Sequence, residues 1–491
     1  MKTKTSNKKN VLVYGAGEAG RQLINSLKTN SKYKVVGIID DNIKLTNKVL
    51  LGIRIHSSSN LKKTALIKNV KLVFLAIPSI GRIRRNQIIK KLIKFKLIVK
   101  SLPSVSQIID GRVTISNIKD LNIDDLLNRE QVKPNLRLLN QNIKKKTVLV
   151  TGAGGSIGSE LCRQIIKLKP NKLLLLELNE FALYKIYEEL ITYEKKQKVI
   201  PLLADAQDQK KIEIIFEKFN VDTVYHAAAY KHVPLVEENI SSGVKNNVFS
   251  TLAIVKACLM KKVSNFVLIS SDKAVRPTNI MGASKRLAEL CVQGIYDNTE
   301  KPYTNFSIVR FGNVLESSGS VIPKFKKQIS DGAPVTLTHK DVTRYFMTIT
   351  EAAQLVIQAG AMSKHSEVFV LDMGKSIKIF DLVNKMINLL GFSVKDRKNP
   401  SGDIKIKIIG LRPGEKLYEE LLVGKNPQKT IHPKIQKISD PFIPYDKLEI
   451  ELDKLKILLS INKVAAIKKL LIKLLKSYKS NSKIIDHIYV K

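Results

Sequence analysis

The chain has 491 residues, of which 44% are hydrophobic, and a formal net charge of +41. This length predicts two or three domains with sizeable cores. No stretch reaches the roughly 18 to 20 uninterrupted apolar residues that span a bilayer. The basic N-terminus runs into a strand-like segment without the apolar region of a signal peptide, so we expect a cytoplasmic protein.

The lysines are spread from end to end, and no nucleic-acid-binding motif accompanies them. We interpret them as solvated surface charge, which leaves binding of an acidic surface, such as nucleic acid or anionic lipid, as the alternative. The three cysteines Cys162, Cys258 and Cys291 lie far apart without metal-ligand spacing. They predict free thiols in a reducing compartment, and we expect no metal site.

The first predicted unit opens with VLVYGAGEAGRQLINSL, an apolar strand followed by a glycine turn and a helical pattern. The strand-like segments KVVGIID, KLVFLAIP and KLIVKSLP follow, separated by helix-like runs. This alternation predicts a parallel sheet wrapped by helices. Gly15, Gly17 and Gly20, with Asp40 and Asp41 downstream, match a dinucleotide-binding fingerprint, but no catalytic constellation follows. Either nucleotide binding or a structural or regulatory role fits this unit.

A polar stretch over residues 120–146 joins this unit to a second one, which opens with TVLVTGAGGSIGSELCRQII. Five further strand-like segments follow it: KLLLLEL, KVIPLLAD, TVYHAAA, NFVLISS and FSIVRFGN. We therefore predict an α/β protein with two Rossmann-type, doubly wound parallel-sheet domains in tandem. The expected divisions are an N-terminal domain (1–120), a linker (121–145), a catalytic domain with a smaller substrate-binding part (146–440) and a C-terminal helical segment (441–491).

The segment INKVAAIKKLLIKLLKSY places apolar side chains on one helical face and lysines on the other. A helix docked on the core is the favoured interpretation, and a membrane-surface helix is the alternative. The apolar face consists of Ile467, Leu470, Leu471, Leu474 and Leu475.

The second glycine turn has the GxxGxxG spacing typical of short-chain dehydrogenases. Glycine lets the backbone approach a pyrophosphate, whose charge then lies at the helix N-terminus. Glu177 ends the next strand and suits the adenosine ribose hydroxyls, so NAD is favoured over NADP. Asp205, followed by Ala206, is a candidate for the adenine edge, with a helix N-cap as the alternative. The remaining predicted cofactor-binding residues are Gly152, Gly155, Ser156, Ile157, Gly158, Ala227 and Ala228.

The strand NFVLIS delivers Ser271, Asp272 and Lys273 to the carboxyl end of the sheet, where open α/β folds place their ligands. Downstream, Met281 and Lys285 are four residues apart and lie on one helical face. Lys285 suits the nicotinamide ribose and Ser271 a sugar hydroxyl. Short-chain dehydrogenases usually have a Tyr where this chain has Met281, and a thioether can neither give nor take a proton.

Five segments carry a family resemblance: SSDKAVRPTNIMGASKRLAEL, HAAAYKHVPLVE, VRFGNVLESSGSVIP, VTRYFMTITEAAQLV and GLRPGEKLYEELL. With them the chain resembles the polysaccharide-biosynthesis (CapD-like) branch of the extended short-chain dehydrogenases, over nearly its whole length. Characterised members are UDP-N-acetylglucosamine 4,6-dehydratases. Longer relatives carry membrane-spanning helices before the first Rossmann unit, which this chain lacks, so we expect at most peripheral membrane association.

The resemblance implies that NAD takes a hydride from sugar C4 and returns it to C6 after a base removes the C5 proton and water leaves from C6. Asp272 then serves as the acid and Lys273 as the base. The larger members also have Met at position 281, so we interpret Met281 as a mark of subtype. The C4 hydroxyl proton must pass to Asp272, to Lys273 or to a water held by Ser271.

The resemblance also implies a UDP-sugar site and surface glycan synthesis as the destination of the product. Family segments predict substrate contacts at Lys231, His232, Asn313, Arg412 and Glu415. We expect a homo-oligomer that does not bind nucleic acid. The rival functions are a nucleotide-sugar 4-epimerase, which should have the Tyr, and a non-catalytic NAD-sensing protein, which should have lost the acid and the base.

Overall fold

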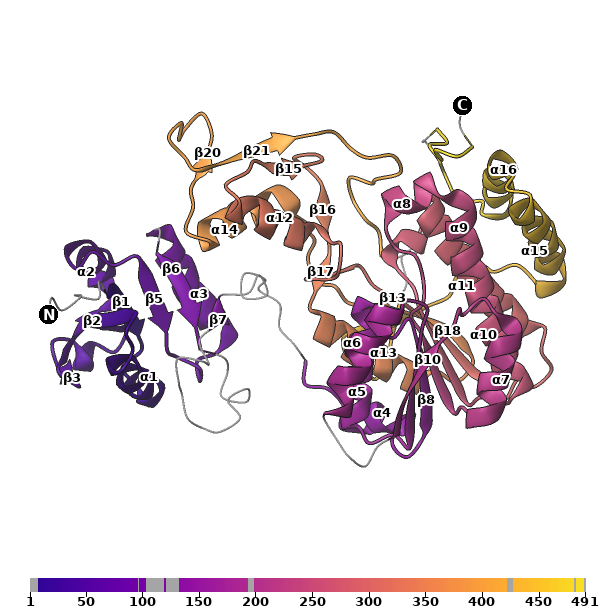
Figure 1. Ribbon diagram of the computed structural model, residues 1–491, viewed down its shortest axis with the longest axis horizontal. Coiled ribbons are helices and arrows are strands. Elements are labelled where there is room, and N and C mark those ends of the chain that lie inside the picture. Colours follow the sequence, from indigo (N-terminus) through magenta and orange to yellow (C-terminus); the bar gives the residue numbers. More distant parts are fainter. Residues whose placement is uncertain are drawn as a thin grey trace, which may run out of the picture. The chain divides into compact units, whose positions relative to one another are not determined.

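The computed structural model describes residues 8–95, 97–102, 119–120, 132–192, 198–421, 427–480 and 483–489. These residues group into two compact units. The first contains the described residues up to 120 together with 324–337 and 380–407, and the second contains the remaining described residues. Figure 1 labels the elements of both units.

In the described part of the first unit, seven strands form one sheet in the order β3-β4-β2-β1-β5-β6-β7. The expected apolar segments form its central parallel strands, as predicted. The strands are β1 (Lys9–Tyr14), β2 (Tyr33–Asp40), β3 (Val49–Leu50), β4 (Ile53–Ser57), β5 (Leu72–Leu75), β6 (Ile98–Ser101) and β7 (Lys119–Asp120), and the helices are α1 (Glu18–Lys28), α2 (Leu61–Ile67) and α3 (Arg82–Lys94).

Two segments expected within residues 146–440 group with the first unit instead. Leu389, the last residue of α14, shares a buried cluster with Leu92 and Val99 of the first unit. The elements of these segments are α12 (Val321–Ser330), β15 (Val335–Leu337), α14 (Ile379–Leu389), β20 (Val394–Lys395) and β21 (Ile404–Ile408). Sequence order alone could not reveal this grouping, since the two segments lie more than 200 residues from the first sheet.

The second unit is built on a nine-stranded sheet, counted over the described residues, in the order β10-β9-β8-β11-β12-β13-β18-β23-β22. The strands from β10 to β18 in that order run parallel, while β23 and β22 add an antiparallel edge. They are β8 (Thr147–Thr151), β9 (Lys172–Glu177), β10 (Lys198–Leu203), β11 (Thr223–His226), β12 (Asn265–Ile269), β13 (Asn305–Arg310), β18 (Ser366–Leu371), β22 (Gln428–Lys429) and β23 (Ile435–Ile438).

Helices cover both faces of this sheet, as a doubly wound fold requires. Side chains of α5 (Ser156–Lys167), α6 (Glu180–Ile191) and α13 (Ile349–Met362) bury one face. Those of α7 (Gln209–Phe219), α10 (Ser250–Met260) and α11 (Ile280–Asp297) bury the other. The shorter elements are α8 (Val233–Glu238), α9 (Ile240–Val244), β14 (Asn313–Val314), β16 (Thr343–Arg344), β17 (Phe346–Met347) and β19 (Ile377–Lys378).

Part of the expected linker is folded. Residues 121–131 lie outside the described residues, but α4 (Leu136–Gln141) buries Leu138 and Leu139. The backbone N–H of Asn135 donates to Oε1 of Gln358 on α13 at 2.8 Å. Residues from 135 onward therefore belong to the second unit, because their apolar side chains cover one of its helices.

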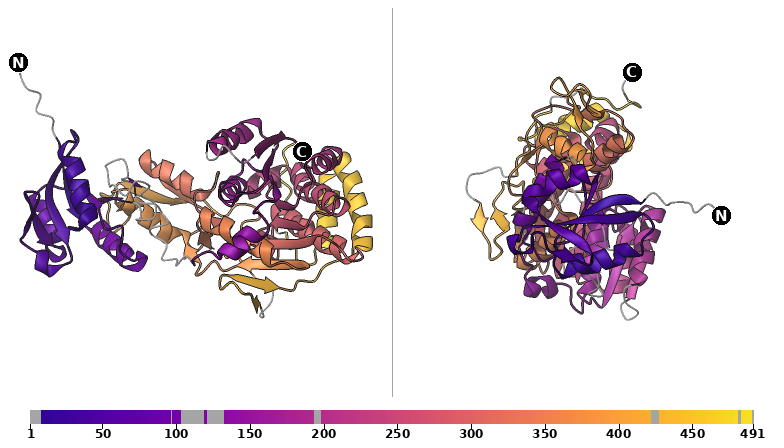
Figure 2. Two further views of the ribbon diagram at one scale, coloured as in Figure 1. Left: turned by 90° about the horizontal axis from the view of Figure 1, so that it is seen from below. Right: turned by 90° about the vertical axis from the view of Figure 1, so that its left-hand side faces the viewer.

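The C-terminal helices α15 (Tyr445–Ser460) and α16 (Val464–Leu474) lie side by side, yellow in Figures 1 and 2. Ile467 and Leu471 are fully buried in the core cluster that includes α11, while Lys469 and Lys473 are exposed. The docked-helix prediction is confirmed.

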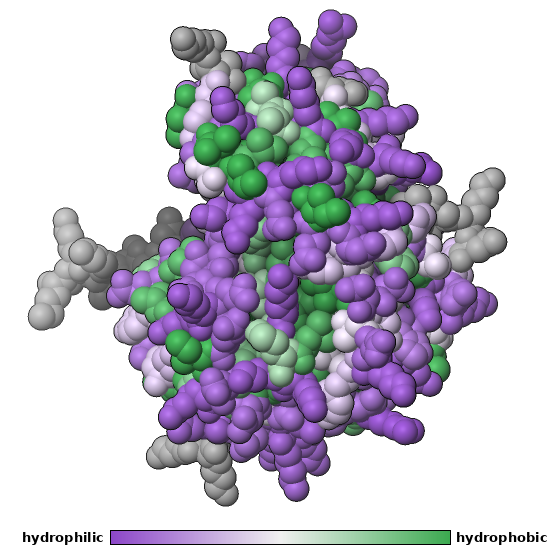
Figure 3. All heavy atoms as spheres, turned by 90° about the vertical axis from the view of Figure 1, so that its right-hand side faces the viewer, coloured by the Kyte–Doolittle hydropathy of each residue, from purple (hydrophilic) through white to green (hydrophobic). Residues whose placement is uncertain are grey.

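Mostly hydrophilic side chains, with smaller apolar groups among them, cover the face drawn in Figure 3. Among the described residues, no helix combines the length and apolar character needed to cross a membrane.

Candidate active site

The predicted cofactor turn joins the end of β8 to the start of α5. Gly152 has φ +62°, and a Cβ there would lie 2.8 Å from Cα of Ala228. A Cβ on Gly158 would lie 2.0 Å from the carbonyl oxygen of Gly152. The turn and the helix therefore pack at a separation that only glycine allows, which leaves the N-terminus of α5 open to an anion.

Glu177 holds this turn from the end of β9. Its Oε2 accepts a hydrogen bond from the N–H of Gly154 at 3.0 Å, and its Oε1 accepts from Leu178 and Asn179 at 2.9 and 3.0 Å. The carboxylate is thus fixed beside the glycine turn, where the sequence predicted it for the ribose.

Asp205 follows β10 and does not cap a helix. The N-cap of α7 is Asp208, whose carboxylate accepts from the N–H of Lys211 at 3.1 Å. Asp205 instead accepts from the N–H of Gln207 at 2.9 Å, beside the buried Ala206. The N-cap alternative was wrong, because the helix begins three residues later than that alternative required.

The other predicted cofactor residues surround the same turn. The N–H groups of Ala227 and Ala228 donate to the carbonyl and hydroxyl oxygens of Thr151, which holds the two strand ends together. Ile157 packs at the edge of the adjoining core, and Gly155 is exposed. The Ser156 hydroxyl accepts from the N–H of Ser318 at 3.0 Å, so the loop after β14 reaches the start of α5.

The predicted acid–base pair, Asp272 and Lys273, lies just beyond β12. Asp272 is 1% exposed, and its Oδ1 accepts from the Ser271 hydroxyl at 2.9 Å and from Lys273 Nζ at 3.0 Å. Lys273 Nζ also donates to Oδ1 of Asn313 at 3.2 Å. Burial alone would lower the pKa of Lys273, but the carboxylates of Asp272 and Glu419 outweigh it and raise that pKa.

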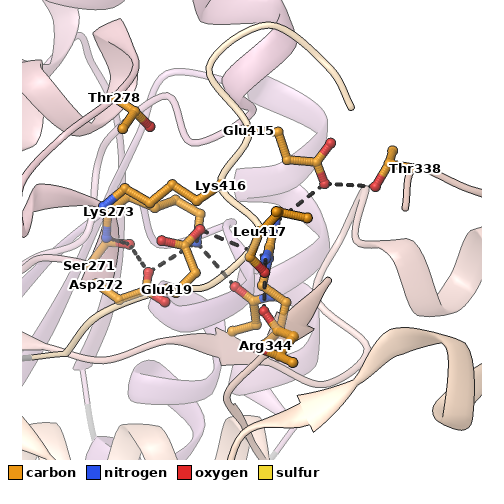
Figure 4. A network of polar contacts seen from close by, with 12 residues as sticks. Ser271, Asp272, Lys273, Thr278, Thr338, Arg344, Glu415, Lys416, Leu417 and Glu419 are labelled. Carbon is orange, nitrogen blue, oxygen red and sulfur yellow. Dashed lines mark hydrogen bonds and ion pairs between the residues drawn. The ribbon is translucent and has the colours of Figure 1, made fainter. Parts of the chain in front are cut away.

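The structure adds two charged residues that the sequence reasoning missed, Glu419 and Arg344 (Figure 4). Glu419 Oε1 lies 3.6 Å from Lys273 Nζ and 3.9 Å from Nε of Arg344. Arg344 is 8% exposed and comes from β16, whereas Glu419 comes from the segment after LRPGEK. Both lie within motifs that carried the family resemblance, which was the available signal.

The helix α11 positions the remaining predicted catalytic residues. Lys285 is 7% exposed, its Nζ donates to the carbonyl oxygen of Ile269 at 2.7 Å, and burial lowers its pKa to about 8 although Glu289 partly offsets this. Met281 is 2% exposed and belongs to the core cluster. Burial, and then the charge of Lys285, lower the pKa of the nearby His226 to about 3.

The predicted substrate residues fall into two groups. Asn313 accepts from Lys273 Nζ at 3.2 Å, and Glu415 accepts from Thr338 at 3.0 Å and from Arg344 at 3.3 Å. Arg412 is exposed on the loop that includes Gly414, whose carbonyl oxygen accepts from the Thr278 hydroxyl at 2.9 Å. Glu415 thus holds Arg344 in this structure, and the loop is fastened to the turn before α11.

Lys231 and His232 lie on the segment between β11 and α8. Lys231 is exposed and His232 is half-buried. A Cβ on Gly319, which has φ +67°, would lie 2.3 Å from Cε1 of His232. The loop that reaches Ser156 therefore also packs against the imidazole of His232.

Arg310, in the RFGNV segment, is a structural residue. It is fully buried, and its Nη2 lies 2.6 Å from Oε2 of Glu289 and 2.6 Å from Oδ2 of Asp440. Glu289 also accepts from the Ser270 hydroxyl at 2.6 Å. Ser270 thus joins this ion network to the chain just after β12, two residues before Asp272.

The glycine turn of the first unit repeats the geometry of the second. The N–H of Ala16 donates to Oδ2 of Asp40 at 2.7 Å, as Gly154 donates to Glu177. The neighbouring Asp41 has other partners: it accepts from the Tyr14 hydroxyl at 2.8 Å and pairs with Arg84 at 3.0 Å. Nucleotide binding and a structural or regulatory role both stay predictions for this unit.

Comparisons with known proteins now bear on this site. Residues 148–440 match the family described as "Polysaccharide biosynthesis protein", and residues 7–66 match "C2185-like, N-terminal". The chain is 43% identical over 434 residues to "Capsular polysaccharide biosynthesis protein CapD" of Staphylococcus aureus, covering 87% of this chain and 70% of that one. The solved structure of Pen from Bacillus thuringiensis is 33% identical, with a TM-score of 0.55, over 61% of this chain and 91% of that one.

Two further relatives have different activities in their names. "UDP-N-acetylglucosamine 4,6-dehydratase (inverting)" of Campylobacter jejuni is 30% identical over 57% of this chain and 78% of its own. "UDP-glucose 4-epimerase" of Rickettsia canadensis is 30% identical over 58% of this chain and 80% of its own. On the matched family and the relative from Staphylococcus aureus, the chain belongs to the CapD-like polysaccharide biosynthesis protein family.

Proposed function

We propose that this chain is an NAD-dependent nucleotide-sugar 4,6-dehydratase that converts UDP-N-acetylglucosamine to the 4-keto-6-deoxy sugar, for surface polysaccharide or glycan synthesis. The observation that supports this most is the buried pair Asp272–Lys273, held 3.0 Å apart at the carboxyl end of the sheet. Dehydration across C5–C6 needs an acid and a base side by side. Oxidation or epimerisation at C4 alone does not.

The residues around α5 fit NAD. Gly152 and Gly158 leave space for the pyrophosphate, and Glu177 offers a carboxylate to the ribose hydroxyls that would repel a 2′-phosphate, so NADP is less favoured. When bound, NAD supplies the acceptor that takes a hydride from C4 and returns it to C6. The Lys285 ammonium group would hold the nicotinamide ribose.

The acid and the base then act on the sugar. Once C4 is a ketone, the C5 proton is acidic enough for Lys273 to remove. Asp272 protonates the C6 hydroxyl, which leaves as water. Because Asp272 is only 1% exposed, bulk solvent does not compete for this proton. After the hydride reaches C6, a proton returns to C5.

The test is to incubate the pure protein with UDP-N-acetylglucosamine in D₂O and to follow the product by NMR. Loss of the C6 hydroxyl with deuterium at C5 is the expected result, and the C5 configuration of the product distinguishes retention from inversion. We expect Asp272→Asn and Lys273→Ala to abolish turnover. Full activity of the Lys273→Ala protein would refute the assignment.

The second candidate is a nucleotide-sugar 4-epimerase, which the relative from Rickettsia canadensis favours. Here the same NMR experiment would show inversion at C4 without loss of the C6 hydroxyl. The buried thioether of Met281 argues against this candidate, because an epimerase of this type uses the Tyr at that position.

A further inference from the structure

The proposed reaction has several proton transfers, and Asp272 and Lys273 alone cannot hold all the protons if the transfers occur one after another. The C4 hydroxyl and C5 each lose a proton, and the departing C6 hydroxyl and C5 each gain one. The ion pair of Lys273 and Asp272 has two proton-binding sites, the amine and the carboxylate, and one of them already holds a proton. The C4 proton fills the second, so no site is left for the C5 proton unless water leaves at the same instant.

Glu419 provides a third site beside this pair. It is 8% exposed, and its Oε1 lies 3.6 Å from Lys273 Nζ (Figure 4). Its Oε2 is buried and has no hydrogen-bond partner among the described residues, and the same holds for Oδ2 of Asp272. A buried carboxylate oxygen without a partner is costly, and such atoms usually have a functional reason.

Burial is the main reason why the carboxyl of Glu419 can hold a proton. Burial raises the pKa of its carboxyl, and the charge of Asp272 adds to this, while Lys273, Arg344 and Lys416 act in the opposite direction. A buried carboxyl with a raised pKa holds a proton more readily than an exposed glutamate, and Glu419 lies 3.6 Å from the lysine that would deliver that proton.

We propose that Glu419 is the proton reservoir of this site: it takes from Lys273 the proton that leaves the C4 hydroxyl, so that Lys273 is neutral when the C5 proton must be removed. Lys273 first passes its ammonium proton to Asp272, which lies 3.0 Å away. Neutral Lys273 then takes the proton of the C4 oxygen and passes it to Glu419. Lys273 next removes the C5 proton and later returns it to C5, while Asp272 protonates the leaving hydroxyl and regains a proton from Glu419 after water has departed. Each turnover thus ends with the starting protonation. Glu419 acts through Lys273, and this inference rests on the proposed dehydratase function.

The test compares Glu419→Gln with the unaltered protein, both loaded with NAD. In the Gln variant Lys273 can accept one proton but cannot pass it on. We expect reduced nicotinamide to accumulate on adding UDP-N-acetylglucosamine, seen by its near-ultraviolet absorbance, while product formation falls about 10²- to 10⁴-fold. Substrate recovered from D₂O should carry no deuterium at C5.

The matched control is Glu420→Gln, because Glu420 is the adjacent carboxylate and pairs with the exposed Arg276 at 2.9 Å. It should leave both steps unchanged. If Glu419→Gln is poorly folded, Glu419→Asp keeps an ionisable group and should recover product formation over Gln. The proposal is overturned if Glu419→Gln forms product within threefold of the unaltered protein, if oxidation and dehydration fall together, or if Asp and Gln behave alike. Absence of product from the unaltered protein would instead refute the dehydratase function itself.

Discussion

Replacing Glu289 by Gln removes one of the two carboxylates, the other being Asp440, that pair with the buried Arg286 and Arg310. Its oxygens accept from Arg310 at 2.8 and 2.6 Å and from Arg286 at 2.9 Å, and Glu289 and Arg310 are fully buried. Glutamine has nearly the same shape, so the substitution creates no cavity. It leaves the arginines with only Asp440 as a carboxylate partner in this network.

The expected loss of unfolding free energy follows from the pKa of Glu289. Burial alone would raise its pKa, but the cations of Arg310 and Arg286 lower it to about 2, from an ordinary 4.5. A difference of about 2.5 units is worth about 3 kcal/mol. Because the folded-state pKa is lowered, this stabilisation is present above pH 4.5 and is lost as the pH falls through about 2. Removing one partner of a buried ion pair typically costs about 3–5 kcal/mol, which agrees.

The assay is urea unfolding followed by circular dichroism, since the chain contains no tryptophan. Hydrogen exchange of peptides from β13 and α11 shows whether the loss of stability lies in the second unit. The control is Glu189→Gln, which removes a pair with Arg163 at 2.6 Å whose two side chains are each 33% exposed. The control should lose at most about 1 kcal/mol. A loss for Glu289→Gln no larger than that of the control would refute the reasoning.

Three further outcomes are expected. Gly158→Ala should abolish NAD binding measured by calorimetry, because its Cβ would meet the carbonyl oxygen of Gly152, whereas Gly81→Ala, where the space is open, should not. If the charged form of Lys285 holds the ribose, NAD affinity should fall as the pH rises through about 8, and Lys285→Met should remove that pH dependence. Met281→Tyr should retain turnover in the NMR assay but lose about 1–3 kcal/mol of unfolding free energy, because the larger ring enters a packed core. Abolished turnover in a folded Met281→Tyr protein would contradict this prediction.

Much of the fold could be predicted from local pattern. The apolar strands and glycine turns placed both parallel sheets, because strand, turn and helix follow one another within about 30 residues and each has its own periodicity. The antiparallel strands β22 and β23 and the regrouping of 324–337 and 380–407 were missed, since they depend on contacts between distant segments. The folded part of the expected linker was missed for the same reason.

The sequence by itself determined which candidate residues are neighbours along the chain: Asp272 beside Lys273, Lys285 four residues after Met281, and Glu177 at the end of the strand after the glycine turn. Only the tertiary structure brought Glu419 and Arg344 to Lys273, and only it made Arg310 a structural residue. The physical reason is that a charge acts through space and burial. Glu419 lies 146 residues from Lys273 in the chain, yet 3.6 Å separates their charged atoms.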